Sequence, residues 1–138
     1  MTVSWEISGD SVRFNLEAPT TGWVAIGFDP SSAMKDAQFI IAYVQDGDVF
    51  IRDDFGTGFF THASDEALGG TDDISNAEGS EQNGKTAVSF TIPLDSGDRH
   101  DAVLASGKKH ALLISYGRDG ADDFSLKHQS RSSVNITL

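Results

Sequence analysis

Two residues of this sequence have side chains and surroundings that suit the binding of a metal ion or another ligand. Met34 lies in a small, polar segment (residues 31–36) between two strongly apolar stretches, and its thioether is a soft ligand that can bind iron. His128 lies just before the last apolar alternation of the chain. Each also has a simpler interpretation, because a methionine often plugs the end of a packed core and a lone histidine is usually a surface or hydrogen-bonded residue. The same ordinary role is expected for the other histidines, which are His62, His100 and His110.

The sign of the charge changes along the chain. Residues 53–84 hold eight acidic residues and no Lys or Arg, whereas residues 99–138 hold six Lys or Arg and four Asp. One interpretation is that cations of the second segment gather near an anionic ligand, since Lys and Arg are the usual partners of carboxylates and phosphates. The other is simple charge balance along a solvated edge. The cations in question are Arg118, Lys127 and Arg131.

Other metal-binding or catalytic patterns have little support. Several pairs of Asp residues could hold calcium, but none follows the twelve-residue loop spacing that is specific for this ion. The histidines are too scattered for a zinc site, and the sequence contains neither a Gly-x-Ser-x-Gly nucleophile motif nor a phosphate-binding glycine pattern. We therefore expect no catalysis by this chain alone and no nucleotide binding. The Asp pairs are Asp46 and Asp48, Asp53 and Asp54, Asp72 and Asp73, and Asp122 and Asp123.

The composition excludes several classes of partner. The chain has 138 residues with 10 Lys and Arg against 21 Asp and Glu, a formal net charge of −11, whereas nucleic acids and anionic membranes need a cationic face. The absence of cysteine excludes disulfides, thiolate metal sites and covalently attached c-type haem. The longest apolar run, residues 39–44, is too short to span a bilayer. No signal peptide precedes the first strand pattern, so an exported protein would begin here after its cleavage site.

The elements that must position these residues are strands. Apolar and polar residues alternate from Val3 onward, as in half-buried strands, and turn signals such as Asp46-Gly47 separate the alternating segments. Residues 22–28 and 38–44 are apolar on both faces, which indicates central strands of a packed sandwich. Residues 53–86 show little alternation and are expected to form a long irregular excursion with at most a short strand or helical turn. No amphipathic helix is evident, and the pattern predicts a single all-β domain over residues 1–138.

Several motifs of this chain resemble the DOMON domain family. They are GWVAIGF at residues 22–28, MKDA at 34–37, and KHQSR at 127–131 ahead of VNITL at 134–138. The resemblance implies an immunoglobulin-like antiparallel β-sandwich of about eight to eleven strands. In the haem-binding branch of this family it further implies b-type haem held between Met34 and His128 as axial ligands. The family's loop often reads Gly-Met followed by Gly-Ala-Asp, so the acidic position after the alanine is replaced here by Gln38.

The haem interpretation assigns roles to further residues. With Met and His ligands both axial positions are filled, so the iron would pass single electrons and have no open site for substrate. Without cysteine the haem b must be non-covalent, and its propionates would need cations, for which Arg118, Lys127 and Arg131 are the candidates. Four aromatic residues could flank the porphyrin, although ordinary sandwich core is the simpler interpretation of each. They are Trp23, Phe28, Phe39 and Phe124.

These implications predict an electron-transfer module rather than an enzyme. Any catalysis would belong to a redox partner protein or domain, toward which the acidic surface could help docking. The expected location is extracytoplasmic: periplasmic, secreted or at the cell surface. The alternative is a non-redox module that binds carbohydrate or another small ligand on its aromatic residues, with Met34 and His128 merely structural. A further alternative is a non-catalytic accessory domain.

Overall fold

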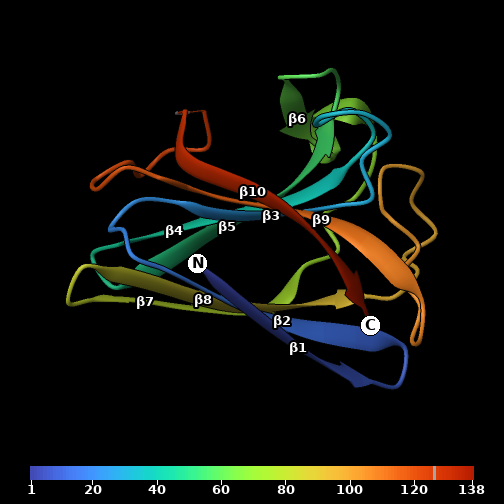
Figure 1. Cartoon of the computed structure of the whole chain (residues 1–138), viewed down its shortest axis with the longest axis horizontal. Coiled ribbons are helices and arrows are strands. Elements are labelled where there is room, and N and C mark those ends of the chain that lie inside the picture. Colours follow the sequence, from blue (N-terminus) through green and yellow to red (C-terminus); the bar gives the residue numbers. More distant parts are fainter. Residues whose placement is uncertain (126) are drawn as a thin grey trace.

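The computed structural model describes residues 1–125 and 127–138, and its architecture is a sandwich of two antiparallel sheets (Figure 1). The four-stranded sheet has the order β1 (Thr2–Ser8), β2 (Ser11–Ala18), β8 (Lys85–Pro93) and β7 (Ser75–Gln82). The six-stranded sheet has the order β10 (His128–Thr137), β9 (Lys109–Gly117), β3 (Val24–Phe28), β4 (Gln38–Gln45), β5 (Asp48–Gly56) and β6 (His62–Ser64). The predicted all-β sandwich is confirmed.

Helical structure is almost missing from the described residues. The only helix among them is η1, a 3₁₀ turn over Glu66–Leu68. Accordingly, no helix in the described part of the chain has the length and apolar character needed to cross a membrane.

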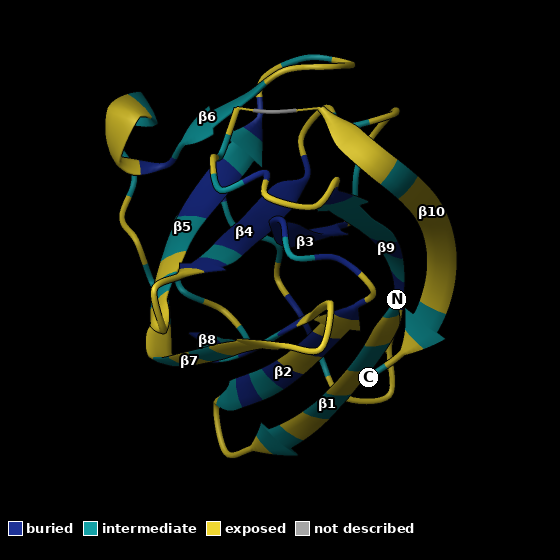
Figure 2. Cartoon of the chain, turned by 90° about the vertical axis from the view of Figure 1, so that its left-hand side faces the viewer, coloured by how far each residue is buried: buried dark blue, intermediate teal, exposed yellow. Residues whose placement is uncertain are grey.

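The main core lies between the two sheets, where alternate residues of each strand point inward. Phe14 of β2 is its centre, because its ring lies 5.1 Å from the ring of Phe28 and 5.9 Å from that of Phe90. All three side chains are fully buried, and such aromatic pairs add about 0.5–1.5 kcal/mol each beyond the area that they bury. Figure 2 shows which strands are buried: β3 and β4 are buried, whereas the edge strand β10 is largely exposed.

A second apolar cluster lies on the outer face of the six-stranded sheet. Because side chains alternate along a strand, Ala25 and Phe39 point away from the face that carries Ile26 and Ile40. β3 and β4 are therefore apolar on both faces although only one face meets the other sheet. The outer cluster comprises Trp23, Ala25, Ala37, Phe39, Ile41 and Ala121, with Met34, Tyr43, Leu113 and Phe124 packed against it.

The segment 53–86 is more regular than expected. It begins inside β5, continues through β6 and η1, and includes the whole of β7, which pairs with β8. The prediction of an irregular excursion with at most one short strand was therefore wrong. β7 is an edge strand whose residues are mostly exposed, so its sequence lacks the apolar alternation that marks a half-buried strand.

Candidate functional site

A cavity of about 700 Å³ opens on the outer face of the six-stranded sheet. Its floor comes from β3, β4 and β9, and its walls come from three loops and from β10. This volume falls within the range of about 300–1,000 Å³ that is usual for ligand and cofactor sites. The lining residues are Trp23, Ala25, Ala33, Met34, Phe39, Ile41, Phe59, Phe60, His62, Leu113, Ile114, Ser115, Phe124, Ser125, Lys127, His128, Arg131, Ser132 and Ser133.

Met34 is presented to the cavity by the loop between β3 and β4. The loop is fixed to its neighbours, because the amide of Met34 donates to the carbonyl of Phe59 at 3.3 Å and its own carbonyl accepts from Ala37 at 3.3 Å. Gly56 at the end of β5 packs so closely against the Met34 carbonyl that a Cβ there would overlap it. The side chain of Met34 is therefore half-buried at a defined place on the wall rather than plugging the sandwich core.

His128 reaches the cavity through a β-bulge at the start of β10. His128 pairs with Gly117 while Ser130 pairs with Tyr116, so two residues of β10 advance against one of β9. Beyond the bulge Arg131 faces outward, and a regular strand would have turned His128 to the opposite face from Arg131, because successive side chains alternate. The bulge instead brings both side chains to the cavity, where His128 is exposed at the mouth.

Trp23 and Phe39 on the floor of the cavity pack directly against glycines. A Cβ at Gly117 would come within 2.5 Å of Trp23 Nε1, and a Cβ at Gly27 would overlap the ring of Phe39. Trp23 Nε1 is buried and has no hydrogen-bond partner among the described residues. Buried donors nearly always have a partner, so this N–H, which faces the backbone at Gly117, is an exception within the floor of the cavity.

Phe124 forms a wall that two other side chains hold in place. The guanidinium of Arg52 lies 4.6 Å from the centre of the Phe124 ring, and the ring of Tyr43 lies 5.0 Å from it. Arg52 is itself held by two hydrogen bonds to Asp54, at 2.5 and 2.7 Å. This chain of contacts fixes an aromatic side chain that would otherwise be free in a loop.

His62 also lines the cavity, although nothing in its sequence neighbourhood singled it out. Its Nδ1 lies 2.5 Å from Asp54 Oδ2, and since a carboxylate only accepts, Nδ1–H is the donor and Nε2 is left unprotonated in the neutral ring. Burial alone would raise the pKa of Asp54, but the hydrogen bonds from His62 and Arg52 outweigh it and lower this pKa. Phe59 and Phe60, which are exposed at the rim, were also missed.

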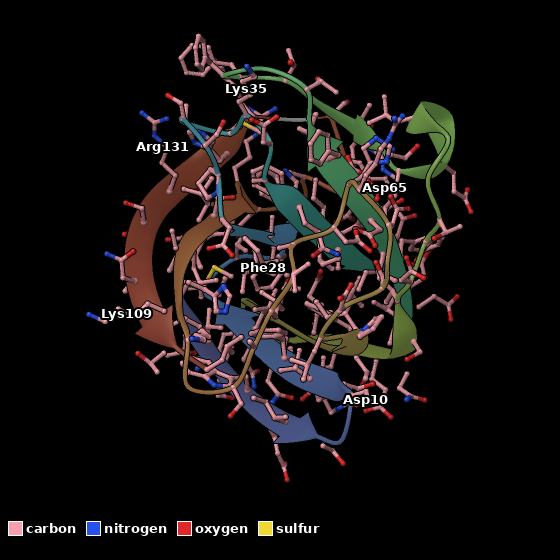
Figure 3. The ribbon with its side chains drawn as sticks, turned by 90° about the vertical axis from the view of Figure 1, so that its right-hand side faces the viewer. Asp10, Phe28, Lys35, Asp65, Lys109 and Arg131 are labelled. Carbon is pink, nitrogen blue, oxygen red and sulfur yellow. The ribbon has the colours of Figure 1, made fainter. Side chains whose placement is uncertain are left out.

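The structure brings most of the predicted site residues together, with two exceptions. Phe28 lies in the core between the sheets (Figure 3), where it is fully buried against Phe14, and it does not line the cavity. Arg118 is exposed in the loop after β9 and does not line the cavity. The residues that do line it are Trp23, Met34, Phe39, Phe124, Lys127, His128 and Arg131.

Comparison with known proteins agrees with this architecture. The model of the DOMON domain matches residues 1–117. DBH-like monooxygenase protein 1 of Homo sapiens is 24% identical over 138 residues, which cover 99% of this chain and 22% of that protein. MOXD1 homolog 2 of Drosophila melanogaster is 24% identical over 118 residues, which cover 85% of this chain and 15% of that protein. The chain thus spans less than a quarter of the length of either relative.

Two solved structures share the fold. One is the cytochrome domain of Myriococcum thermophilum cellobiose dehydrogenase, with a TM-score of 0.66, 14% identity, and coverage of 94% of this chain and 67% of that one. The other is the cytochrome b domain of pyranose dehydrogenase from Coprinopsis cinerea, with a TM-score of 0.65, 8% identity, and coverage of 92% and 67%. At these identities the likeness is one of fold.

Proposed function

Since this chain belongs to the DOMON domain family, we propose that its outer-face cavity binds haem b non-covalently and that the chain is an electron-transfer module. The observation that carries the proposal is the cavity itself, an apolar site with a thioether on one wall and an imidazole on another. Two proteins of the same fold are named as cytochrome domains, which supports this choice of ligand.

Met34 and His128 are the proposed axial ligands. They come from elements far apart in the sequence, the β3–β4 loop and the start of β10, and both line the cavity. Haem so ligated exchanges one electron at a time, with a potential raised by the thioether. An iron bound by both side chains would have no coordination position left for a substrate, so this chain by itself is proposed to be a carrier and not an enzyme.

The remaining cavity residues suit the two ends of such a ligand. The floor of Ala25, Phe39 and Ile41 is apolar and would exclude water from a porphyrin face. Lys127 and Arg131 are exposed at the lining and would pair with propionates, as Lys and Arg do with carboxylates.

The chain matches only a small part of each relative, and this bears on where catalysis would take place. Those relatives are named as monooxygenases, and the chain covers less than a quarter of each. We therefore place catalysis in a partner protein or partner domain with which this module, one domain over residues 1–138, exchanges electrons. An extracytoplasmic location, in the periplasm, secreted or on the cell surface, is part of the same proposal.

The test is a haemin titration of the full chain followed by visible spectra of the oxidised and reduced forms. We expect stoichiometric uptake and the sharp bands of a six-coordinate, low-spin iron. His128→Ala and Met34→Ala should each lose the low-spin spectrum. His62→Gln is the matched control, because His62 lines the same cavity and is not a proposed ligand. A protein that takes up no haemin would overturn the proposal.

The same experiment separates other assignments. Low-spin bands that persist in His128→Ala but vanish in His62→Gln would replace His128 by His62 as ligand. A colourless protein that binds oligosaccharides, and loses this binding when Trp23 is replaced, would instead support the carbohydrate-binding alternative.

A further inference from the structure

A second group of polar side chains lies on the other face of β5, away from the cavity. Asp53 and Ile40 are directly paired and so share the inner face of the sheet, whereas Asp54 is on the outer face. Around Asp53 gather carboxylates from three further segments, and we call the set the carboxylate cluster. Its members are Asp53 of β5, Asp65 next to η1, Asp73 before β7, and Asp98 and Asp101 between β8 and β9.

The carboxylate oxygens of the cluster are closely spaced. Ligand atoms of Asp53, Asp73 and Asp101 all lie within 4.8 Å of one another, and so do those of Asp65, Asp98 and His100. Two oxygens bound to one calcium ion at 2.3–2.6 Å can be at most about 5 Å apart. The first triad therefore already has the spacing of a single coordination sphere.

Several of these buried oxygens have no hydrogen-bond partner among the described residues. Asp65 is fully buried, and neither of its carboxylate oxygens is hydrogen-bonded. Asp53 is 1% exposed and its Oδ2 lacks a partner, as does Oδ1 of Asp101. Buried charged oxygens are costly unless paired, hydrogen-bonded or bound to a metal, so these oxygens require a partner that the side chains do not supply.

No cationic side chain fills that need in the part of the chain that the structure describes. None of its ion pairs joins a Lys or Arg to the cluster, and the side chain that does pair with it is His100, whose Nδ1 lies 3.3 Å from Asp98 Oδ1. Asp98 itself is satisfied, since it accepts from the amides of Thr71 at 2.7 Å and of His100 at 2.9 Å. The oxygens without a partner belong to Asp53, Asp65 and Asp101.

The pKa values of three cluster carboxyls are raised, which reflects the same lack of positive partners. Burial, together with repulsion from Asp101 and Asp65, raises the pKa of Asp53 to about 9. Burial and repulsion from Asp98 raise the pKa of Asp65 to about 6, and the pKa of Asp101 is raised by burial and by Asp65 and Asp73. A divalent cation would relieve this repulsion where a proton otherwise must.

We propose that Asp53, Asp73 and Asp101, with Asp65 beside them, bind a calcium ion. The donors are oxygens from a rigid strand and three loops, which suits the six to eight ligands and flexible geometry of calcium better than the strict octahedron of magnesium. Zinc is disfavoured because its sites need nitrogen or sulfur ligands, and His100 lies in the other triad. Figure 3 shows Asp65 on the opposite side of the molecule from Arg131, so the ion site is separate from the cavity.

The site is tested by calorimetric titration of the EGTA-treated, dialysed full chain with CaCl₂, and by thermal unfolding with and without CaCl₂. We expect one ion per chain and a higher melting temperature in calcium. Asp53→Asn and Asp101→Asn should bind calcium at least tenfold more weakly. Glu66→Gln removes one charge next to Asp65 from an exposed position and is the matched control, expected to bind like the parent.

Folding of the variants is checked in the same melts. Asp53→Asn should be at least as stable as the parent in EGTA, because the neutral amide needs no bound proton at the buried position, and should gain less stability from CaCl₂ than the parent. No heat and no thermal shift with CaCl₂ for the parent chain would overturn the proposal. So would equal binding by the parent and both cluster variants, or tighter binding of MgCl₂ than of CaCl₂. None of these measurements uses haem, so the result is independent of the function proposed for the cavity.

Discussion

His128 is paired with Gly117 across β9 and β10, one residue out of step with the pairing that begins at Ser130. The irregularity lies at Gln129, which does not line the cavity although His128 does. Bulges commonly re-aim a side chain next to a functional site. Here the bulge decides whether an imidazole reaches the cavity or turns away from it.

The exchange variant His128→Gln/Gln129→His tests this geometry at constant composition and charge. We expect it to fold but to lose low-spin haem ligation, because the imidazole now sits at the position that does not line the cavity. The measurement is the visible spectrum after haemin titration, with circular dichroism as the folding control. An unchanged low-spin spectrum would show that the register of the bulge is immaterial.

The two arginines near the end of the chain should behave differently. Arg131 lines the cavity and Arg118 does not, although both are exposed. Arg131→Ala is expected to weaken haemin binding up to about fivefold, the equivalent of about 1 kcal/mol for an exposed ion pair. Arg118→Ala should leave the affinity within error of the parent. Equal losses in the two variants would mean that net charge rather than position matters.

Gly117 should be intolerant of a side chain. A Cβ there would meet the indole of Trp23 at 2.5 Å, and the indole lies on the cavity floor. Gly117→Ala is therefore expected to cost about 1–3 kcal/mol in the free energy of unfolding, as overpacking does, and to weaken haemin binding. Urea denaturation and haemin titration measure the two effects. Ser133→Ala, on the facing strand, should change neither by as much.

The calcium-free protein should lose stability as the pH rises. The pKa of Asp53 is raised to about 9, so between pH 4 and pH 9 the folded state holds a proton that the unfolded chain releases. The free energy of unfolding then falls with increasing pH over that window. We expect the urea midpoint in EGTA to be lower at pH 8 than at pH 5, with a smaller difference in Asp53→Asn. If the parent and Asp53→Asn had the same pH dependence of stability, the raised pKa of Asp53 would be contradicted.

The sequence predicted those features for which the residue type or its alternation is typical of one environment. Alternation identified most strands, and Met34 and His128 stood out because their surroundings did not explain them; both line the cavity. Phe28 and Phe39 could not be told apart, because both lie in strands that are apolar on both faces. Only the pairing of β3 with its neighbours assigns Phe28 to the core and Phe39 to the cavity floor.

Other features depend on long-range geometry that local pattern does not encode. Arg118 and Arg131 are the same residue type and lie close in the sequence. Arg118 nevertheless lies in the loop after β9, away from the cavity, whereas Arg131 lies in β10 and lines it. The bulge at Gln129 arises from pairing with β9, and the carboxylate cluster gathers segments that are widely spaced along the chain. Asp53 was one of several Asp residues in candidate pairs, and only the fold shows that it is buried.

Asp53 and Asp54 are neighbours on β5 whose side chains leave opposite faces of the sheet. Asp54 holds Arg52 and His62 at the cavity wall, while Asp53 belongs to the carboxylate cluster. One peptide unit thus joins the two sites, so a shift of β5 on ion binding would also move the residues that Asp54 holds at the wall. Thermodynamic reciprocity then requires that, if calcium changes the affinity for haem by some factor, haem changes the affinity for calcium by the same factor.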